Sequence, residues 1–184
     1  FRGFIHVEGV SAKDVRKEKI NFADFSAIIF TSKNAVDHFF RVCEEMRHEV
    51  SADMKYFCIS ETIALYLQKY IQYRKRKIFF GKQTARDLEE VLKKHTNEKF
   101  LFPCSDVANE ETQKWLQENG YDFTPAVLFR TVISDIQDLE DVFYDVIVFF
   151  SPSSVQSLYE NFPDFKQNHT RIAAFGATTQ QELL

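Results

Sequence analysis

The sequence predicts an α/β protein made of two similar doubly wound parallel-sheet domains. Short apolar runs alternate with stretches of helical spacing along most of the 184 residues. The stretch AIIFTSKNAVDHFF at residues 27–40 recurs as VIVFFSPSSVQSLY at residues 146–159, with a constant offset of 119, and repetition at such a distance indicates related units. The composition, 45% hydrophobic and 27% charged, suits a globular chain that buries one large or two small cores.

The first copy of the repeat lies among strands and helices that alternate. The expected elements are strands over residues 4–10 and 25–30, a helix over 34–46, a strand over 56–59 and a helix over 63–70. Ser32 or Asn34 is expected to cap the helix over 34–46, because these side chains accept hydrogen bonds from free backbone N–H groups. Ser60, Glu61 and Thr62 form the next turn.

The same alternation continues through the middle of the chain. The expected elements are a strand over residues 78–80, a helix from Thr84 to about His95, a strand over 100–102, a turn over 103–109, a helix over 110–119 and a strand over 126–132. Thr84 and Asp87 have capping-box spacing, which marks a helix start. Gly120 is expected to end its helix, because glycine accepts the left-handed conformation found there.

The second copy predicts a strand over residues 146–150, a turn over 151–154, a helix over 155–161 broken at Pro163, a strand over 172–175, a turn over 176–178 and a helix from Thr179. Strands and helices that alternate at this spacing form parallel sheets covered by helices. The two units are therefore expected to share one architecture.

The turns after the strands are the candidate binding site, because ligands of doubly wound sheets bind beyond the carboxyl ends of the strands. Free N–H groups at helix N-termini attract carboxylates and phosphates, so the turns suit a polyanion. The candidate residues are Thr31, Ser32, Asn34, Ser60, Thr62, Ser105, Ser151, Ser153, Gly176, Thr178 and Thr179. Each of them taken singly can equally be a helix cap that contributes about 1 kcal/mol of stability.

Several other functions lack a signal. The chain has neither a Gly-x-Gly-x-x-Gly motif nor a phosphate-binding P-loop, and its five His residues show no metal-ligand spacing. The net charge of −4 argues against a nucleic-acid partner. The basic run over residues 73–77 is interpreted as a solvated connection, with an anion-attracting rim as the alternative.

The three cysteines are Cys43, Cys58 and Cys104, an odd number without a Cys-x-x-Cys pair, which is typical of reduced intracellular thiols. Cys104 is interpreted as an apolar filler rather than a nucleophile. No apolar run approaches the roughly 20 residues needed to cross a bilayer, and no leader opens the chain, so a cytoplasmic protein without a membrane partner is expected.

The ordered turns IIFTSKNAV, LFPCSD, FFSPSS and FGATT, with the strand LFRTV at residues 128–132, resemble those of the uroporphyrinogen-III synthase family. The resemblance covers about residues 25–184. It implies a cyclising lyase that converts hydroxymethylbilane, a linear tetrapyrrole, into uroporphyrinogen III with inversion of ring D and loss of water. It also implies no cofactor and no metal, and we expect a monomer.

The family's fold implies two α/β domains joined by a two-stranded connection, with the substrate in the cleft between them. On this pattern residues 4–132 would form a complete domain with connecting strands at both ends. Residues 133–184 would form part of the second, whose opening strand-helix unit and closing segment are expected to lie outside the sequence. The substrate's acetate and propionate arms match turns that attract anions.

The chain departs from the family pattern at a few positions. Phe129 occupies the position of the family's Tyr, a candidate for assisting departure of the hydroxyl, and Phe cannot donate that hydrogen bond. Ile63 stands where the family usually has Thr, Ser154 where it has Gly, and Ala177 where it has Pro. The catalytic residues therefore stay unassigned. The alternatives are a catalytically degenerate relative, or an unrelated two-domain α/β protein that binds a polyanionic small molecule.

Overall fold

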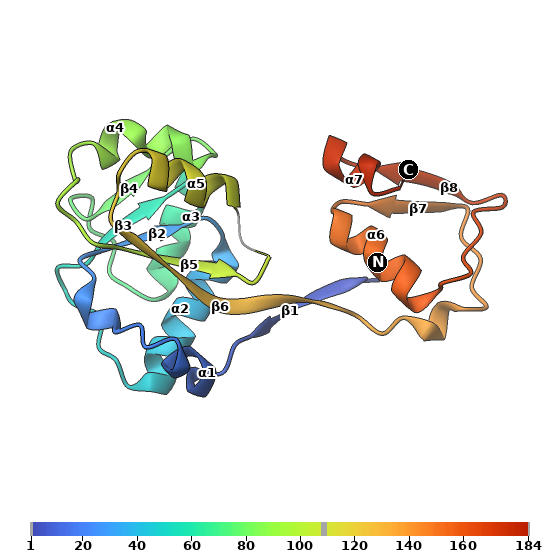
Figure 1. The fold of residues 1–184 in the computed structure, drawn as a ribbon, viewed down its shortest axis with the longest axis horizontal. Helices are drawn as coiled ribbons and strands as arrows, with labels where there is room; N and C mark the ends of the chain where they lie inside the picture. The colour runs from blue at the N-terminus through green and yellow to red at the C-terminus, as the bar shows by residue number, and fades with distance from the viewer. Residues whose placement is uncertain (1, 108–109, 184) are drawn as a thin grey trace. The chain divides into compact units, whose positions relative to one another are not determined.

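The computed structural model describes residues 2–107 and 110–183, and it divides into two compact units (Figure 1). The larger unit spans Gly9–Arg130, and the smaller unit comprises the chain up to Glu8 together with the chain from Thr131 onward. The sequence-based ranges 4–132 and 133–184 placed the first strand with the larger unit. The structure assigns most of it to the smaller one, because the Phe4 carbonyl accepts a 2.6 Å hydrogen bond from the Ser157 hydroxyl.

A six-stranded sheet of order β1-β6-β5-β2-β3-β4 runs through the larger unit, and most of β1 and the last residues of β6 belong to the smaller unit. The strands are β1 (Ile5–Gly9), β2 (Ala27–Phe30), β3 (Lys55–Cys58), β4 (Ile78–Phe80), β5 (Phe100–Ser105) and β6 (Phe123–Ile133). The five strands from β2 to β6 pair in parallel. β1 runs antiparallel to β6, because its neighbours Val10 and Phe4 bond to Leu128 and Ser134, respectively, in reversed order.

Helices cover both faces of this sheet, as expected for a doubly wound fold. They are α1 (Ala12–Lys17), α2 (Lys33–Met46), α3 (Glu61–Tyr66), α4 (Glu89–Leu92) and α5 (Glu110–Glu118), with the 3₁₀ turns η1 (Phe22–Asp24), η2 (Leu67–Lys69) and η3 (Ala85–Leu88). Ile28 and Phe30 of β2 pack in the core under α2 and α3, whereas Ala27 and Ile29 pack in the core under α4 and α5. Successive side chains of β2 point to opposite faces of the sheet, so the strand contributes to both cores.

The boundaries differ from the prediction where local signals were weak. β5 continues through Pro103 to Ser105 instead of turning at residue 103. This is tolerated because its pairing with β2 ends at Leu101, so the missing proline N–H breaks no bond there. The helix expected over 63–70 starts at Glu61 and passes into η2, and the helix expected to reach His95 ends at Leu92. α1 and η1 were not predicted.

Two of the predicted helix signals have the expected geometry. Thr84 and Asp87 form a capping box at the start of η3. Gly120 has φ 71°, and the bond from Tyr121 N to Leu116 O, 3.1 Å long, closes the end of α5.

The smaller unit contains two parallel strands, β7 (Val146–Phe149) and β8 (Arg171–Ala174). The helices α6 (Pro152–Asn161) and α7 (Ala177–Gln181) follow these strands, and the 3₁₀ turn η4 (Gln137–Leu139) precedes them. Phe149, Val155 and Leu158 form its buried cluster. The α/β class with parallel sheets is therefore confirmed in both units, although α6 and α7 begin two or three residues before the positions predicted from sequence.

Candidate functional site

The strand order of the larger unit reverses between β2 and β5, because the chain builds β3 and β4 on one side of β2 and then crosses to β5 on the other. Ligands of doubly wound sheets bind in the crevice at such a switch point, beyond the carboxyl ends of the two strands. β2 ends at Phe30 and leads into Thr31, Ser32 and Asn34, and β5 ends at Ser105. The structure therefore brings the predicted residues of these two turns to one edge of the sheet.

The turn after β2 is built around Ser32, which is the N-cap of α2 with an extended backbone (φ −157°, ψ 162°). Its hydroxyl oxygen accepts a 3.0 Å hydrogen bond from Ala35 N. The backbone N–H groups of the first helical turn have no acceptor within their own helix. Thr31 is half-buried and Asn34 is exposed in that turn. Ser32 therefore acts as a cap, and the N–H groups beside it are the groups that can receive an anion.

The smaller unit repeats this turn. Ser151 is the N-cap of α6 with nearly the same backbone (φ −153°, ψ 153°), and its hydroxyl oxygen accepts a 3.3 Å bond from Ser154 N. The Ser151 and Ser154 hydroxyl oxygens also lie 2.8 Å apart. Ser153, predicted in a turn, lies half-buried in the first turn of α6. The sequence repeat thus corresponds to one recurring conformation.

A third turn has the same shape but a different charge. Ser60 caps α3 (φ −145°, ψ 157°), and Glu61 and the exposed Thr62 occupy its first turn. α5 likewise begins with Glu110 and Glu111. The first turns of α2, α6 and α7, all within the described residues, hold no Asp or Glu. Acidic residues neutralise the positive end of a helix, so α2 and α6 are the better anion sites.

Side chains around α2 add to its positive potential. The Lys33 ammonium lies 5.2 Å from the centre of the Tyr66 ring. The Asp37 carboxylate accepts hydrogen bonds from Tyr66, Tyr70 and Lys69. Burial acts to raise the pKa of Asp37, but the bonds from Tyr70, Lys69 and Tyr66 outweigh it and hold that pKa below its ordinary value. The negative charge of Asp37 is thereby paired with the ammonium group of Lys69.

The remaining predicted residues have different environments. Gly176 is the N-cap of α7 with φ 90°, a conformation that favours glycine. Thr178 is exposed, but Thr179 is only 2% exposed, so its side chain is not available to a ligand in solution. The Ser105 hydroxyl donates to Val107 O over 3.0 Å. Residues 108 and 109 of this predicted turn lie outside the described residues.

Phe150 and Phe175 form an aromatic pair that no sequence pattern indicated. Their rings stack at 5.0 Å with an interplanar angle of 8°, and the residues are 69% and 60% exposed. They directly precede Ser151 and Gly176, at the carboxyl ends of β7 and β8. A Phe at the last position of the two strands predicted over residues 146–150 and 172–175 was the available signal, but the two residues become a pair only once the strands are known to be adjacent.

Phe129 is 7% exposed and stacks on His38 at 5.2 Å. Arg41 Nε donates to His38 Nδ1 over 3.1 Å, so the neutral ring carries its proton on Nε2. Burial, followed by the charge of Arg41, holds the pKa of His38 below its ordinary value of 6.5. The imidazole is therefore neutral at neutral pH.

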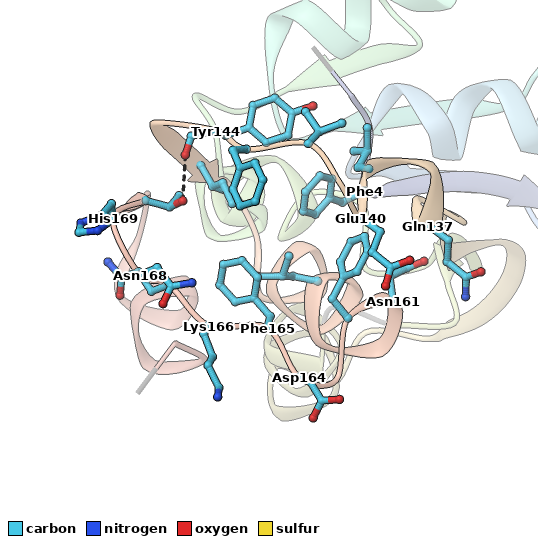
Figure 2. A pocket seen from close by; sticks show the side chains of 18 of the residues that line it. Phe4, Gln137, Glu140, Tyr144, Asn161, Asp164, Phe165, Lys166, Asn168 and His169 are labelled. Atoms are coloured by element: carbon cyan, nitrogen blue, oxygen red, sulfur yellow. Dashed lines mark hydrogen bonds between the residues drawn. The ribbon is translucent and has the colours of Figure 1, made fainter.

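A pocket of about 970 Å³ in the smaller unit lies elsewhere (Figure 2). Its lining includes Tyr144 and Asp145 before β7, His169 and Thr170 before β8, and Phe162 after α6. The Thr170 hydroxyl donates to Tyr144 O over 2.8 Å at its rim. The pocket thus opens at the amino ends of β7 and β8, whereas the Ser151 turn lies at the carboxyl end of β7.

Other chemistries find little support in the described part of the chain. Residues 2–107 and 110–183 contain no group of three His, Cys, Asp or Glu that could hold a metal ion. Burial raises the pKa of Cys43 and Cys58 to about 12 and that of Cys104 to about 11, so these thiols are protonated. Cys104 is buried, as the sequence predicted. No helix of the described residues is long and apolar enough to span a membrane.

Comparison with known proteins finds one matching family and several solved structures with a similar fold. A family profile described as uroporphyrinogen-III synthase HemD matches residues 4–184. Uroporphyrinogen-III synthetase from Helicobacter pylori is 19% identical, with 98% of this chain and 81% of that chain covered and a TM-score of 0.67. A mutant uroporphyrinogen III synthase from the extremely thermophilic bacterium Thermus thermophilus is 14% identical, with 98% and 76% covered and a TM-score of 0.58.

A second uroporphyrinogen III synthase structure from Thermus thermophilus is 17% identical, with 96% of this chain and 75% of that chain covered and a TM-score of 0.52. At these identities the structures establish the fold alone. A sequence search among curated proteins finds no match. The family profile spans nearly the whole sequence, and the chain therefore belongs to the uroporphyrinogen-III synthase family.

Proposed function

We propose that this chain is a uroporphyrinogen-III synthase, a cyclising lyase of tetrapyrrole and haem biosynthesis. It converts hydroxymethylbilane into uroporphyrinogen III with inversion of ring D and loss of water. The family match over residues 4–184 and the fold shared with the solved synthases support this assignment.

One observation supports the substrate-binding role of this chain's own residues. The turns that start α2 and α6 have the same conformation, and neither contains an acidic residue in its first helical turn. An Asp or Glu in the first turn would stabilise each helix, and both helices lack this stabilisation. An anionic ligand can supply the missing negative charge, and the acetate and propionate arms of the substrate are such anions.

The catalytic contribution proposed for these residues is positioning. The turn at Ser32 in the larger unit and the turn at Ser151 in the smaller unit each offer backbone N–H groups that can hold a carboxylate. Carboxylates held in fixed positions favour the inverted closure over the spontaneous uninverted one. The exposed rings of Phe150 and Phe175 offer a flat apolar surface next to the second turn. Pyrrole rings are flat, and stacking on aromatic rings would orient them without adding charge.

Phe129 supports a second candidate, a relative that binds a tetrapyrrole without efficient catalysis. It is buried against His38 and has no hydrogen-bond donor for a departing hydroxyl. The Phe129→Tyr variant addresses this candidate directly. A phenol that assists the reaction would raise kcat, whereas a phenol that finds no partner would lower stability by about 1–3 kcal/mol without raising kcat.

The experiment that tests the proposed function is incubation of the full chain with freshly prepared hydroxymethylbilane, followed by resolution of the product isomers. We expect uroporphyrinogen III to be enriched over the type I isomer that forms spontaneously. A type I to type III ratio equal to that of the enzyme-free control would contradict the assignment. Tight binding of the substrate in that case would favour the non-catalytic candidate.

Three further parts of this proposal concern the setting of the reaction. The substrate is bound by a monomer without a nucleic-acid partner, and the reaction takes place in the cytoplasm. The three buried free cysteines support a reducing compartment. Sedimentation of the purified chain with and without substrate tests the monomer, and cell fractionation tests the location.

A further inference from the structure

β6 contains a β-bulge at Leu128. In its parallel pairing with β5, Cys104 lies opposite Val127 and Ser105 lies opposite Phe129, so Leu128 is an extra residue. The alternation of a strand is broken there, because Leu128 and Phe129 are both buried while Val127 is exposed. A bulge bends its strand and turns the following side chain to a new direction. Here it turns Phe129 into the core.

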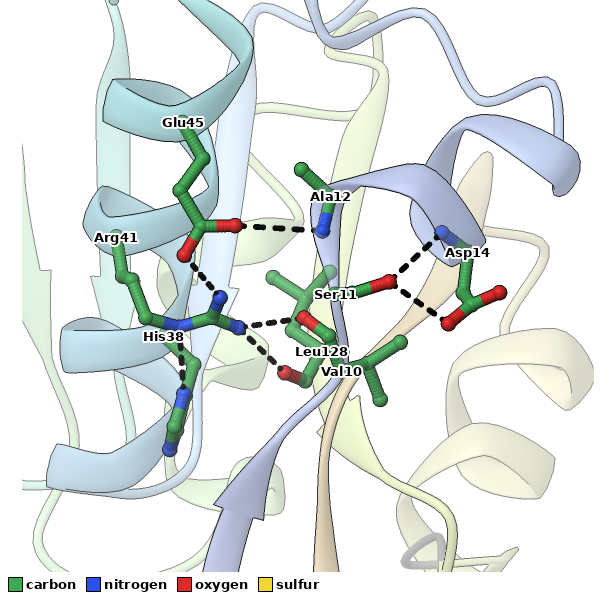
Figure 3. A network of polar contacts seen from close by, with 8 residues as sticks. All are labelled: Val10, Ser11, Ala12, Asp14, His38, Arg41, Glu45 and Leu128. Atoms are coloured by element: carbon green, nitrogen blue, oxygen red, sulfur yellow. Dashed lines mark hydrogen bonds and ion pairs between the residues drawn. The ribbon is translucent and has the colours of Figure 1, made fainter.

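Arg41 of α2 contacts this bulge through the backbone carbonyl of Leu128 (Figure 3). The Leu128 carbonyl accepts a bond from Arg41 Nη2 at 3.2 Å and another from Val10 N at 2.9 Å. The same Nη2 also donates to Val10 O over 2.8 Å. One guanidinium nitrogen thus bridges the backbone at the end of β1 to the bulge in β6.

The guanidinium is oriented by its own helix. Arg41 Nε donates to His38 Nδ1 over 3.1 Å, and Arg41 Nη1 pairs with Glu45 Oε1 at 2.6 Å. Glu45 also accepts a bond from Ala12 N, at 3.3 Å. His38, Arg41 and Glu45 follow one another at spacings of three and four, so they lie on one face of α2. Contacts within α2 and with Glu45 therefore orient the planar guanidinium of Arg41 toward the two strands.

Gly9 leaves the space that the guanidinium occupies. A Cβ placed on Gly9 would lie 2.7 Å from Arg41 Nη2 and 2.8 Å from Arg41 Cζ. The φ of Gly9 is not positive, so the glycine is required here for space and not for backbone conformation. The sequence thus supplies both halves of a close contact, an arginine on α2 and a glycine at the end of β1.

The contact links two parts of the candidate site. Phe129 follows the bulge, stacks on His38 at 5.2 Å, and accepts a 3.2 Å bond from Asp106 N through its carbonyl. Asp106 directly follows Ser105 at the end of β5, and His38 lies one helical turn after Asn34 on α2. The bulge therefore ties the end of β5 to the start of α2, which are the two sides of the topological switch point.

We propose that Arg41 is a positioning residue for this site: by holding the Leu128 bulge against Val10 and Gly9, it sets the placement of the Asn34 turn relative to the Ser105 turn. The proposal rests on the function proposed above, because it concerns the site that would bind the substrate. Arg41 acts through the backbone and through Phe129, and no contact of Arg41 with the substrate is implied.

The test compares Arg41→Met with Arg41→Lys in the full chain. Arg41→Met removes all donors, and we expect faster hydrogen exchange at the amides of Val10 and Ala12 with unchanged exchange in β2. We also expect kcat/KM to fall about ten- to hundredfold, the scale expected when a site is displaced by about 1 Å. Arg41→Lys should recover part of both effects, because an ammonium reaches one carbonyl but cannot reproduce the fork.

Arg86→Met is the matched control, because Arg86 forms an exposed pair with Glu111 at 3.2 Å on the same unit. It should change neither exchange at Val10 nor kcat/KM. Gly9→Ala keeps Arg41 but displaces its guanidinium. It should therefore reproduce the faster exchange and the lower kcat/KM expected of Arg41→Met, and it provides a second test if Arg41→Met folds poorly. Wild-type exchange at Val10 in both Arg41→Met and Gly9→Ala would overturn the proposal, and so would faster exchange with unchanged kcat/KM.

A wild-type chain that does not enrich the type III isomer would refute the proposed function instead. In that case the exchange pattern of Arg41→Met and Gly9→Ala still decides whether Arg41 holds the bulge. An unchanged pattern in these variants would overturn the positioning role independently of the assay for activity.

Discussion

Asn34→Asp adds one negative charge to the α2 turn with almost no change of shape. Asn34 is exposed at the second position of a 14-residue helix whose first turn holds no acidic residue. A carboxylate at this place interacts favourably with the helix dipole and stabilises by about 0.3–1 kcal/mol. In a chain of this size that gain corresponds to a Tm increase of about 1–4 °C.

The same charge should weaken substrate binding if the α2 turn holds a carboxylate of the substrate. Two like charges about 4 Å apart repel by about 1 kcal/mol in bulk water and by more near a protein surface. A penalty of about 1–2 kcal/mol corresponds to a KM increase of about five- to thirtyfold. The variant is therefore expected to become more stable and less able to bind, two effects of opposite sign from one substitution.

The assay combines thermal unfolding with steady-state kinetics on hydroxymethylbilane at low ionic strength. Raising the salt concentration to about 0.15 M shortens the Debye length to about 8 Å and should reduce the KM penalty. Thr62→Asp is the matched comparison, because Thr62 occupies the same position of α3, where Glu61 already neutralises the helix. It should leave KM close to that of wild type.

An Asn34→Asp variant that gains stability but keeps the wild-type KM at low salt would refute the anion-binding role of α2. In that case Ser32 is a cap and nothing more. A Thr62→Asp variant with a KM raised as much as that of Asn34→Asp would instead bring α3 into the binding site.

Three further outcomes are expected. The pKa of His38 is held below 6.5 in the folded chain, so the unfolded chain takes up a proton first as pH falls, and the free energy of unfolding should decline below about pH 6.5. His38→Gln should lack this part of the decline in denaturant titrations from about pH 8 to pH 5. Gly120→Ala should cost about 1–2 kcal/mol in unfolding free energy, because φ is 71° there, and it should leave activity unchanged. Cys43 and Cys58 should resist thiol reagents in the native chain and react once denaturant unfolds it, because burial raises both pKa values to about 12; labelling counted by mass spectrometry checks this.

The parts of the site that the sequence could predict depend on neighbours in the chain. Ser32 and Ser151 were found because a cap bonds to a residue three positions later, and such local signals are visible in the sequence. The apolar runs before them predicted β2 and β7. β2 is buried at all four positions, as a continuous apolar run indicates, whereas Val146 and Val148 of β7 are exposed. The repeat added the expectation that the two turns share a conformation.

The parts that could not be predicted depend on distant contacts. Arg41 and Leu128 are 87 positions apart, and an extra residue in a strand has no distinct composition, so neither the bulge nor its anchor was visible. Phe150 and Phe175 become a pair only through the pairing of β7 with β8. α1 was missed because it is six residues long and buries only Ala12 and Val15, too few for a helical period.

The bond from Val10 N to Leu128 O makes the larger unit resemble a cassette. Its chain enters at Gly9 and leaves at Arg130, on two strands that already pair with each other. A segment whose two ends are adjacent can be inserted into a host, cut out, or exchanged for a homologous segment without rebuilding the rest of the polypeptide. Residues 9–130 are thus a natural module for chimaeras between divergent members of the family. Gly9 and Arg41 should be transferred together, so that each grafted segment keeps its own contact between the arginine and the backbone.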